Sequence, residues 1–562
     1  MYIPRFAIVL LSAVLTAPVV GQTLAAPPAQ PRMRTTPAPQ LESLRAIIAS
    51  ARIDDLRWPD FPDLKAQLDK FYDQSGYKPA WLRDGAPTPQ ALQMIKILQD
   101  ADQAGLEPED YDASRWAHRL NVLGDQHSDL EDTRFDAALT VCVMRYASAL
   151  QVGRINPRHL EFELESRGEK LDLPAFIRQR LVTGSDLDAE LASVEPQLAA
   201  YQRLRSALQH YLDLVPRDDG AKLLPGPVSP GSPYAGIARL TRLLRLLGDL
   251  PDDAKVPDGS TAYDGELVDA VKRFQQRHAL EATGELDSAT IAAMNVPLVV
   301  RLDAMRLGLE RYRWMPYKTD KPRIEVNIPE FELRCLGAEG QVELAMQVNV
   351  GGQYKYQTPL LEADLQYLVF RPYWYPPPDI VRESILPELR RNPSLDNVDL
   401  EVIGAKGRII NSGQVTLAML QRMRSGKMTV REKPGVGNSE GLVKFIFPNP
   451  YHVYLHDTPA DPTTFSAKKR AFSHGCIQVR EPAKLAAWVL RNTDGWDLER
   501  VQRAMHQGRN NVRVDLPSPI PVSTLYETAV VNENGQVYFF PDVYGSDALL
   551  EGQLARGYPY SK

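Results

Sequence analysis

The spacing of apolar residues changes from helical to strand-like near residue 322, and that change limits the folds this chain can adopt. Up to about residue 300, apolar residues recur at helical spacing, as in Ala91, Met94, Ile95 and Leu98. From Pro322 they alternate with polar residues, which is typical of strands. A chain of 562 residues also exceeds the roughly 250–300 residues that one hydrophobic core supports. The sequence therefore predicts several domains, helical first and mostly β afterwards.

The N-terminus has the pattern of an export signal. Arg5 precedes the mostly apolar run 6–15, and small residues follow, which predicts a secretory signal peptide over residues 1–25. The apolar run is about half of the ~20 residues needed to span a bilayer, so we expect cleavage, with an uncleaved anchor as the alternative. Residues 26–40 are rich in proline and small polar residues, which predicts a linker.

The remaining chain divides at turn residues. Residues 41–225 predict an all-helical scaffold, including the long apolar run 137–150, and a proline- and glycine-rich stretch closes it. A small module at 237–297 has amphipathic helical spacing.

The β-domain is predicted at 322–497. A charged, helical insertion at about 380–431 interrupts it, either as a lid over a site or as a solvated decoration. Residues 498–562 are predicted to be a C-terminal structural appendage with a strand at 536–540.

Composition excludes one class of partner, and cysteine usage points to a reactive residue. The formal charge of −6 offers no nucleic-acid footprint. Three cysteines are an odd number, so they cannot form a complete disulfide framework. Cys142 lies in the long apolar run and Cys335 in a predicted strand, so both are expected to pack in cores. Cys476 lies in a polar segment and is expected to react.

Histidines near Cys476 allow two kinds of chemistry. His452, His456, His474 and Cys476 are all acceptable zinc ligands. A predicted strand at 453–455, however, would separate the first two histidines by roughly 13 Å, which disfavours a shared metal ion. No metal or other cofactor is therefore expected.

Nucleophilic catalysis fits these residues better. A thiol attacks as its thiolate, and His456 is a candidate base for Cys476. Gly475 has no side chain, which would let a substrate carbonyl approach backbone amides as an oxyanion site. Because a histidine base needs an orienting partner, we expect a backbone carbonyl near Asp457 to hold the ring. Asp457 itself is expected to form a turn with Pro459.

This window resembles the catalytic domain of L,D-transpeptidases of the YkuD type. His456 is followed eighteen residues later by His474, in the string Ser473-His-Gly-Cys-Ile477. The resemblance implies that Cys476 is the nucleophile and that His456 accepts and returns its proton. It also implies that His474 and Gly475 border the oxyanion site.

The module at 237–297 resembles peptidoglycan-binding type 1 modules, with an inert three-helix spacer as the alternative. The residues that carry this resemblance are Tyr263-Asp-Gly265, Val271, Phe274-Gln275, Gly284, Asp287, Thr290 and Met294-Asn295. The wider pattern is similar to large multidomain, YcbB-like members. Their architecture implies a multidomain α+β fold with an all-α scaffold, a three-helix wall-binding module and a mostly-β catalytic domain carrying a helical capping insertion.

Candidate substrate-binding residues surround the motif. Tyr454 and Trp374 are expected to line the groove, with core packing as the alternative, and Ser473 belongs to the motif itself. Gln478 stands where the family usually has arginine, and Arg480 is the candidate replacement for its charge. Glu440, by the same comparison, stands where relatives tend to carry an apolar residue.

By resemblance, the activity is cross-linking of peptidoglycan stem peptides in cell-wall biogenesis and cell-shape maintenance. The nucleophile would form a thioester with the third stem residue, release D-alanine and transfer the stem to a second stem. Stem peptides and glycan are the expected partners, in the periplasm, with other wall-synthesis proteins as further candidates. Hydrolysis of the thioester by an L,D-carboxypeptidase, a sortase-like transpeptidase and a wall-binding protein with a decayed catalytic domain are the alternatives.

Overall fold

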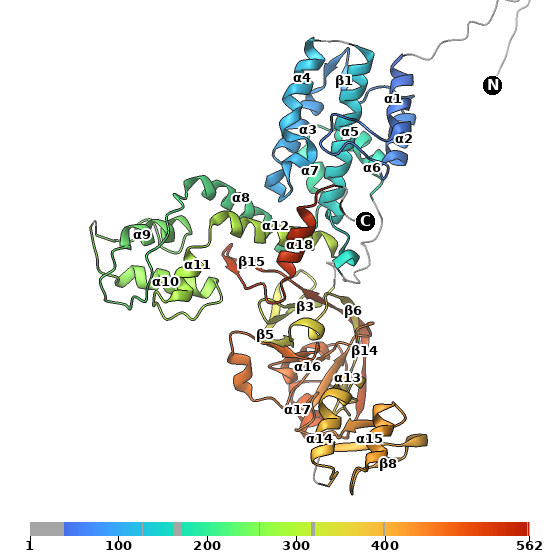
Figure 1. The fold of residues 1–562 in the computed structure, drawn as a ribbon, viewed down its shortest axis with the longest axis vertical. Helices are drawn as coiled ribbons and strands as arrows, with labels where there is room; N and C mark the ends of the chain where they lie inside the picture. The colour runs from blue at the N-terminus through green and yellow to red at the C-terminus, as the bar shows by residue number, and fades with distance from the viewer. Residues whose placement is uncertain are drawn as a thin grey trace, which may run out of the picture.

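The computed structural model describes residues 39–125, 128–160, 171–257, 259–315, 321–396, 399–558 and 560. Figure 1 shows the helical N-terminal domain at the top, a small helical module projecting to one side, and a β-domain below. The predicted signal peptide and nearly all of the predicted linker lie outside the described residues. No helix in this described part is both long and apolar enough to cross a membrane.

The N-terminal domain is helical, as predicted, and is built around helix α5 (Asp129–Val152), most of whose residues are buried. The Ser128 side chain caps α5 by accepting a hydrogen bond from the Glu131 N–H. Cys142 on α5 is fully buried in the core, as expected. The surrounding elements are α1 (Pro39–Ser50), α2 (Lys65–Asp73), β1 (Leu82–Arg83), β2 (Ala86–Pro87), α3 (Pro89–Gln99), α4 (Trp116–Asp125), α6 (Leu173–Phe176), α7 (Leu187–Ala192) and α8 (Ala199–Leu214).

A buried carboxylate ties α5 to the preceding chain. Asp136 accepts hydrogen bonds from the Tyr72 hydroxyl (2.7 Å) and from the N–H groups of Ala80 (2.9 Å) and Trp81 (2.6 Å), and burial raises its pKa to about 6.

We expect Asp136→Ala to lower the free energy of unfolding by roughly 3 kcal/mol or more, because these buried donors lose their acceptor. Thermal unfolding measures this. Asp73→Ala, at an exposed carboxylate, is the control, and equal midpoints for both variants would contradict the expectation.

The projecting module consists of α9 (Ile237–Leu246), α10 (Gly265–Arg277) and α11 (Ser288–Met294). The Gln275 carboxamide holds the turn after α10, since Oε1 accepts from the Gly284 N–H (2.8 Å) and Nε2 donates to the Glu285 carbonyl (2.9 Å). The Tyr263 hydroxyl donates to the Gly284 carbonyl (2.6 Å), and the Asp287 side chain caps α11. Residues that carry the resemblance to peptidoglycan-binding modules therefore hold the turns between these helices, namely Tyr263, Gln275, Gly284 and Asp287.

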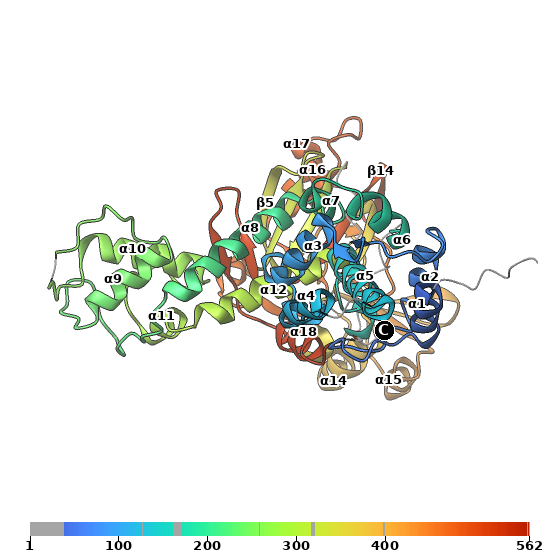
Figure 2. The same ribbon diagram turned by 90° about the horizontal axis from the view of Figure 1, so that it is seen from above.

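Helix α12 (Leu298–Trp314) leads from the module back to the other domains. Figure 2 shows the module at the far end of α8 and α12, away from the rest of the molecule. Within the core between these helices, Arg313 donates to the Ala104 carbonyl (2.6 Å) and to the Tyr201 hydroxyl (2.9 Å). The module is thus carried on a helix whose other end is fixed in the scaffold.

The β-domain is one mixed sheet with strand order β12-β5-β13-β11-β10-β6-β14-β3-β4, and β4 also pairs with β5, so the sheet closes on itself. Helices α16 (Pro482–Val489) and α17 (Leu498–His506) contribute to its core, which includes Leu368, Phe445, Leu455 and Ile477. The strands are β3 (Arg323–Asn327), β4 (Glu332–Leu336), β5 (Val342–Gly351), β6 (Glu362–Phe370), β10 (Val443–Ile446), β11 (Leu455–His456), β12 (Ala471–Ser473), β13 (Ile477–Val479) and β14 (Val512–Leu525).

The boundary predicted at 497 is wrong for the residues that follow it directly. Strand β14 lies between β6 and β3, inside the sheet, and α17 packs in its core. The chain leaves the domain only after β14, through the hairpin β15 (Ala529–Val531) and β16 (Val537–Phe539) and helix α18 (Ser546–Leu554). Tyr558 and Tyr560 then donate hydrogen bonds to Asp63 and Asp110 of the scaffold. The segment after β14 therefore connects the β-domain to the N-terminal scaffold.

The insertion also differs from the prediction, because it is not purely helical. Helices α13 (Pro378–Ile380), α14 (Leu386–Arg391) and α15 (Leu417–Arg424) pack with the antiparallel strands β7 (Leu400–Ile403), β8 (Ile409–Ile410) and β9 (Thr429–Glu432). Buried Val402, Val430 and Leu420 give it a core of its own. The insertion is therefore a small α+β subdomain. Glu383 of the insertion forms an ion pair with Lys355 (2.7 Å), the residue before Tyr356, whose ring packs against His474.

Candidate active site

Strands β11 and β13 bring the candidate nucleophile and base to one face of the sheet. They are parallel, with Leu455 opposite Ile477 and His456 opposite Gln478. Leu455 and Ile477 point into the core and are fully buried. Because side chains alternate along a strand, His456, Gln478 and the preceding Cys476 point to the opposite face. The alternation of core-facing and outward-facing residues along these strands therefore places the candidate nucleophile and base on one face.

Hydrogen bonds fix the loop that holds Cys476. The Ser473 hydroxyl donates to the Cys476 carbonyl (2.5 Å) and accepts from the Gly475 N–H (3.2 Å). Buried Thr358 donates to the Gly475 carbonyl (2.8 Å). Gly475 has a φ of +109°, which favours glycine, and a Cβ there would meet only ordinary van der Waals contacts. Glycine is thus required by the backbone conformation, and its N–H is already bound to Ser473.

The Cys476 thiol is protonated at rest. Its Sγ donates to the His452 carbonyl (3.8 Å), and His452 has the left-handed φ of +55° that turns this carbonyl toward it. Burial raises the pKa of Cys476 to about 11, although the Tyr454 backbone N–H and the Lys444 charge oppose this and Glu440 adds to it. The structure therefore has the thiol hydrogen-bonded to a carbonyl rather than to His456.

His456 is a neutral imidazole with a defined tautomer. Its Nδ1 lies 2.5 Å from the Asp457 carbonyl, as predicted, and because a carbonyl only accepts, Nδ1 carries the proton. Nε2 is then the basic nitrogen. Burial lowers the pKa of His456 to about 4, and the Lys444 charge acts in the same direction. A neutral base therefore lies on the same face as a neutral thiol.

The Asp457 carboxylate holds the turn that precedes β10, whereas residues 457–459 do not form the turn that the sequence predicted with Pro459. It accepts hydrogen bonds from the N–H groups of Leu442 (2.8 Å) and Thr458 (2.8 Å). A Cβ at Gly441 would meet this carboxyl at 2.5 Å. The side chain thus serves the backbone that positions His456, and it does not contact the imidazole.

The other predicted site residues are distributed around this face. Gln478 accepts from the Asn349 carboxamide (3.0 Å), whereas Arg480 donates to Gln347. His474 lies against Tyr356, with ring centroids 4.6 Å apart. Tyr454 accepts from the Ile477 N–H through its carbonyl (2.9 Å).

Trp374 lies at the base of the insertion and is linked to the sheet of that subdomain. Its carbonyl accepts from the Glu432 N–H (2.8 Å), and its side chain is half-buried. The structure records no contact between Trp374 and Cys476 or His456.

Sequence reasoning missed a charged pair, Lys444 and Glu440, at this face. Lys444 lies opposite His456 in β10, and its Nζ is 2.9 Å from Glu440. The signal was present, because Lys444 stands between buried Val443 and Phe445 and so points to the face opposite the core. Glu440 thereby has a physical partner at the position where relatives tend to be apolar.

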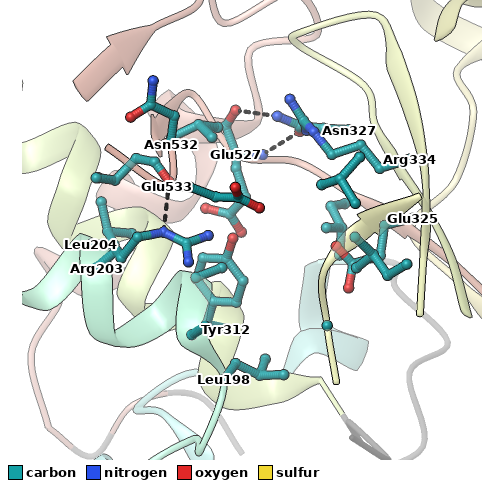
Figure 3. A pocket seen from close by; sticks show the side chains of 18 of the residues that line it. Leu198, Arg203, Leu204, Tyr312, Glu325, Asn327, Arg334, Glu527, Asn532 and Glu533 are labelled. Carbon is teal, nitrogen blue, oxygen red and sulfur yellow. Dashed lines mark hydrogen bonds between the residues drawn. The ribbon is translucent and has the colours of Figure 1, made fainter. Parts of the chain in front are cut away.

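The structure offers no metal centre in the ranges that it describes, since no three of their histidine, cysteine or acidic side chains lie close enough to hold an ion. A cavity of about 640 Å³ lies elsewhere, between α8, α12, β3, β4 and the β15–β16 hairpin. Figure 3 shows Arg203, Arg334 and Glu527 around it, and Arg334 is already paired with Glu330 (2.8 Å). Cys476 does not line this cavity.

Comparisons with known proteins agree with this architecture. Residues 321–504 match the L,D-transpeptidase catalytic domain, residues 66–208 a scaffold domain, and residues 234–294 a "Putative peptidoglycan binding domain". A "Putative L,D-transpeptidase" of Haemophilus influenzae is 29% identical over 229 residues, which are 40% of this chain and 45% of that relative. Matrix metalloproteinase-21 of Mus musculus is 40% identical over 84 residues, 14% of each chain.

The fold, the cysteine and histidine face and these matches define the class of protein. The chain carries an L,D-transpeptidase catalytic domain of the YkuD type together with a helical scaffold and a peptidoglycan-binding module. The chain spans about 45% of the length of the curated relative that it matches, a "Putative L,D-transpeptidase". Domains that act on peptidoglycan imply an extracytoplasmic location.

Proposed function

We propose that this protein is a periplasmic cysteine L,D-transpeptidase that links the third residues of two peptidoglycan stem peptides. The observation that carries the proposal is the register of β11 and β13, which pairs His456 with Gln478, two residues after Cys476, while His456 Nδ1 is bound to the Asp457 carbonyl. That arrangement leaves Nε2 free to take a proton from a thiol. The wall-binding module supports peptidoglycan as the substrate.

The reaction begins with the neutral pair. Cys476 Sγ attacks the carbonyl carbon of the third stem residue while His456 Nε2 takes the thiol proton. The tetrahedral intermediate collapses, the bond to the terminal D-alanine breaks, and His456 returns the proton to the D-alanine nitrogen. The side-chain amine of a second stem then attacks the thioester, His456 takes the amine proton, and the proton returns to the sulfur. The products are a cross-linked pair of stems and the free thiol.

Surrounding groups have distinct roles in this proposal. The Gly475 N–H is engaged by Ser473, so the adjoining Cys476 N–H is the oxyanion donor of the loop, with His474 at its border. The carboxamide of Gln478, held by Asn349, binds the stem next to the nucleophile. Arg480 follows β13 directly and serves a stem carboxylate, while Tyr454 and Trp374 line the groove.

Product analysis tests this function. The full chain is incubated with purified disaccharide tetrapeptides, with Cys476→Ala as the blank, and the products are separated by mass. Dimers joined through their third residues, formed by the wild type alone, support the proposal. Tripeptides without dimers would instead make the protein an L,D-carboxypeptidase, and unchanged tetrapeptides would overturn both activities.

Export is the remaining part of the proposal. The predicted signal peptide over residues 1–25 would place the mature chain in the periplasm, where peptidoglycan is built. N-terminal sequencing of the protein recovered from the periplasm tests it, with a mature start near residues 22–27 expected. Recovery only with an intact Met1 in the membrane fraction would contradict cleavage.

A further inference from the structure

We propose that Lys444 is a positioning residue whose ammonium group, held by Glu440, offsets the negative charge of that carboxylate at Cys476 and so favours formation of the thiolate. This inference rests on the proposed role of Cys476 as nucleophile. It assigns a function to a pair of residues that does not belong to the catalytic motif.

Strand register puts Lys444 on the active-site face. In β10 it lies opposite His456, and His456 in β11 lies opposite Gln478, two residues after Cys476. Neighbouring strands are about 4.8 Å apart, and paired residues point to the same side. The flexible lysine side chain therefore extends over the face that holds the base and the nucleophile.

Glu440 holds the lysine side chain in place through an ion pair. Nζ lies 2.9 Å from Oε2 and 3.2 Å from Oε1, but only Oε1 accepts a well-aligned hydrogen bond, so Oε2 is buried without one. The Lys444 and Glu440 side chains are 18% and 9% exposed, so solvent screens them weakly. The centroid of the Tyr454 ring lies 5.9 Å from Nζ.

The charges of this cluster act on the nucleophile and the base in opposite ways. A cation favours a thiolate and disfavours an imidazolium, so Lys444 lowers the pKa of both Cys476 and His456, while Glu440 raises that of Cys476. The titratable groups from the neighbouring elements are Tyr454 just before β11, Tyr367 on β6 and Glu432 on β9. Lys444 is the cation that acts on both reacting groups.

Alkylation of Cys476 by iodoacetamide reads this field directly. The rate is measured against pH on the full chain, with Cys476→Ala as the blank. Lys444→Met should lower the rate near pH 8 about tenfold, since one pKa unit changes the thiolate fraction tenfold. Glu440→Gln should raise it several-fold, and Lys444→Arg, which keeps the charge, should restore most of the wild-type rate.

Opposite signs distinguish a field from a structural role. If the ion pair only stabilised the fold, Lys444→Met and Glu440→Gln would change the rate in the same direction, and that result would overturn the inference. Thermal unfolding of each variant checks folding, and should Lys444→Met fail to fold, Glu440→Gln still decides, because an unchanged or lower rate contradicts the proposal. The assay needs no stem peptide, so a failure of transpeptidation is detected separately.

Discussion

Cys476→Ala is expected to reduce formation of cross-linked stems by about 10⁴-fold or more, because the covalent intermediate cannot form. The fold should be unaffected, since the loop is held by hydrogen bonds from Ser473 and Thr358 that do not involve the sulfur. Initial rates of dimer formation by the full chain measure the loss, and thermal unfolding verifies the fold.

Cys142→Ala is the matched control for this loss. Cys142 is a fully buried core thiol of the scaffold, and burial holds its pKa well above that of a free thiol. Its replacement should leave the rate of cross-linking within about twofold of the wild type. Cross-linking that survived Cys476→Ala but was lost in Cys142→Ala would show that the nucleophile had been assigned to the wrong cysteine.

His456→Ala is expected to slow acylation by roughly 10²–10⁴-fold, the usual contribution of a general base. The wild-type pH profile carries a second signature of this base. Because the pKa of His456 is lowered to about 4 and that of Cys476 is raised to about 11, the neutral pair predominates between these values. The acylation kcat/KM should therefore be flat from about pH 5.5 to pH 8 and fall only as the pH approaches about 4.

His452→Asn is the control for the histidine. His452 contacts the sulfur through its backbone carbonyl, and asparagine tolerates the left-handed φ at this position. Activity should be retained. An acid limb near pH 6.5, the value of an unperturbed histidine, would contradict a buried neutral base.

Elements with strong local signals were predictable from the sequence. The helical spacing of Ala91, Met94, Ile95 and Leu98 corresponds to α3, where all of them are buried. The contact between His456 and the Asp457 carbonyl was also predictable, because a histidine base needs a partner that orients its ring.

Features that depend on distant pairing were not predictable. Strand β14 joins the sheet through partners in β6 and β3 that are far away in the sequence, so it was assigned to an appendage. The short strand β7 pairs with β8 and β9 within a charged segment, and its alternation is too brief to compete with the neighbouring helical spacing. To predict Lys444 as the partner of Glu440, one would have to know how β10 pairs with β11.

Intact-protein mass spectrometry tests the central claim most directly. The wild-type chain is mixed briefly with a tetrapeptide stem in the absence of an acceptor amine and quenched in acid, and the adduct is located by peptide mapping. The account predicts an added mass equal to the stem without its terminal D-alanine, on the peptide that contains Cys476. An adduct on any other residue, or cross-linked product with no adduct at Cys476 at any time, would contradict it.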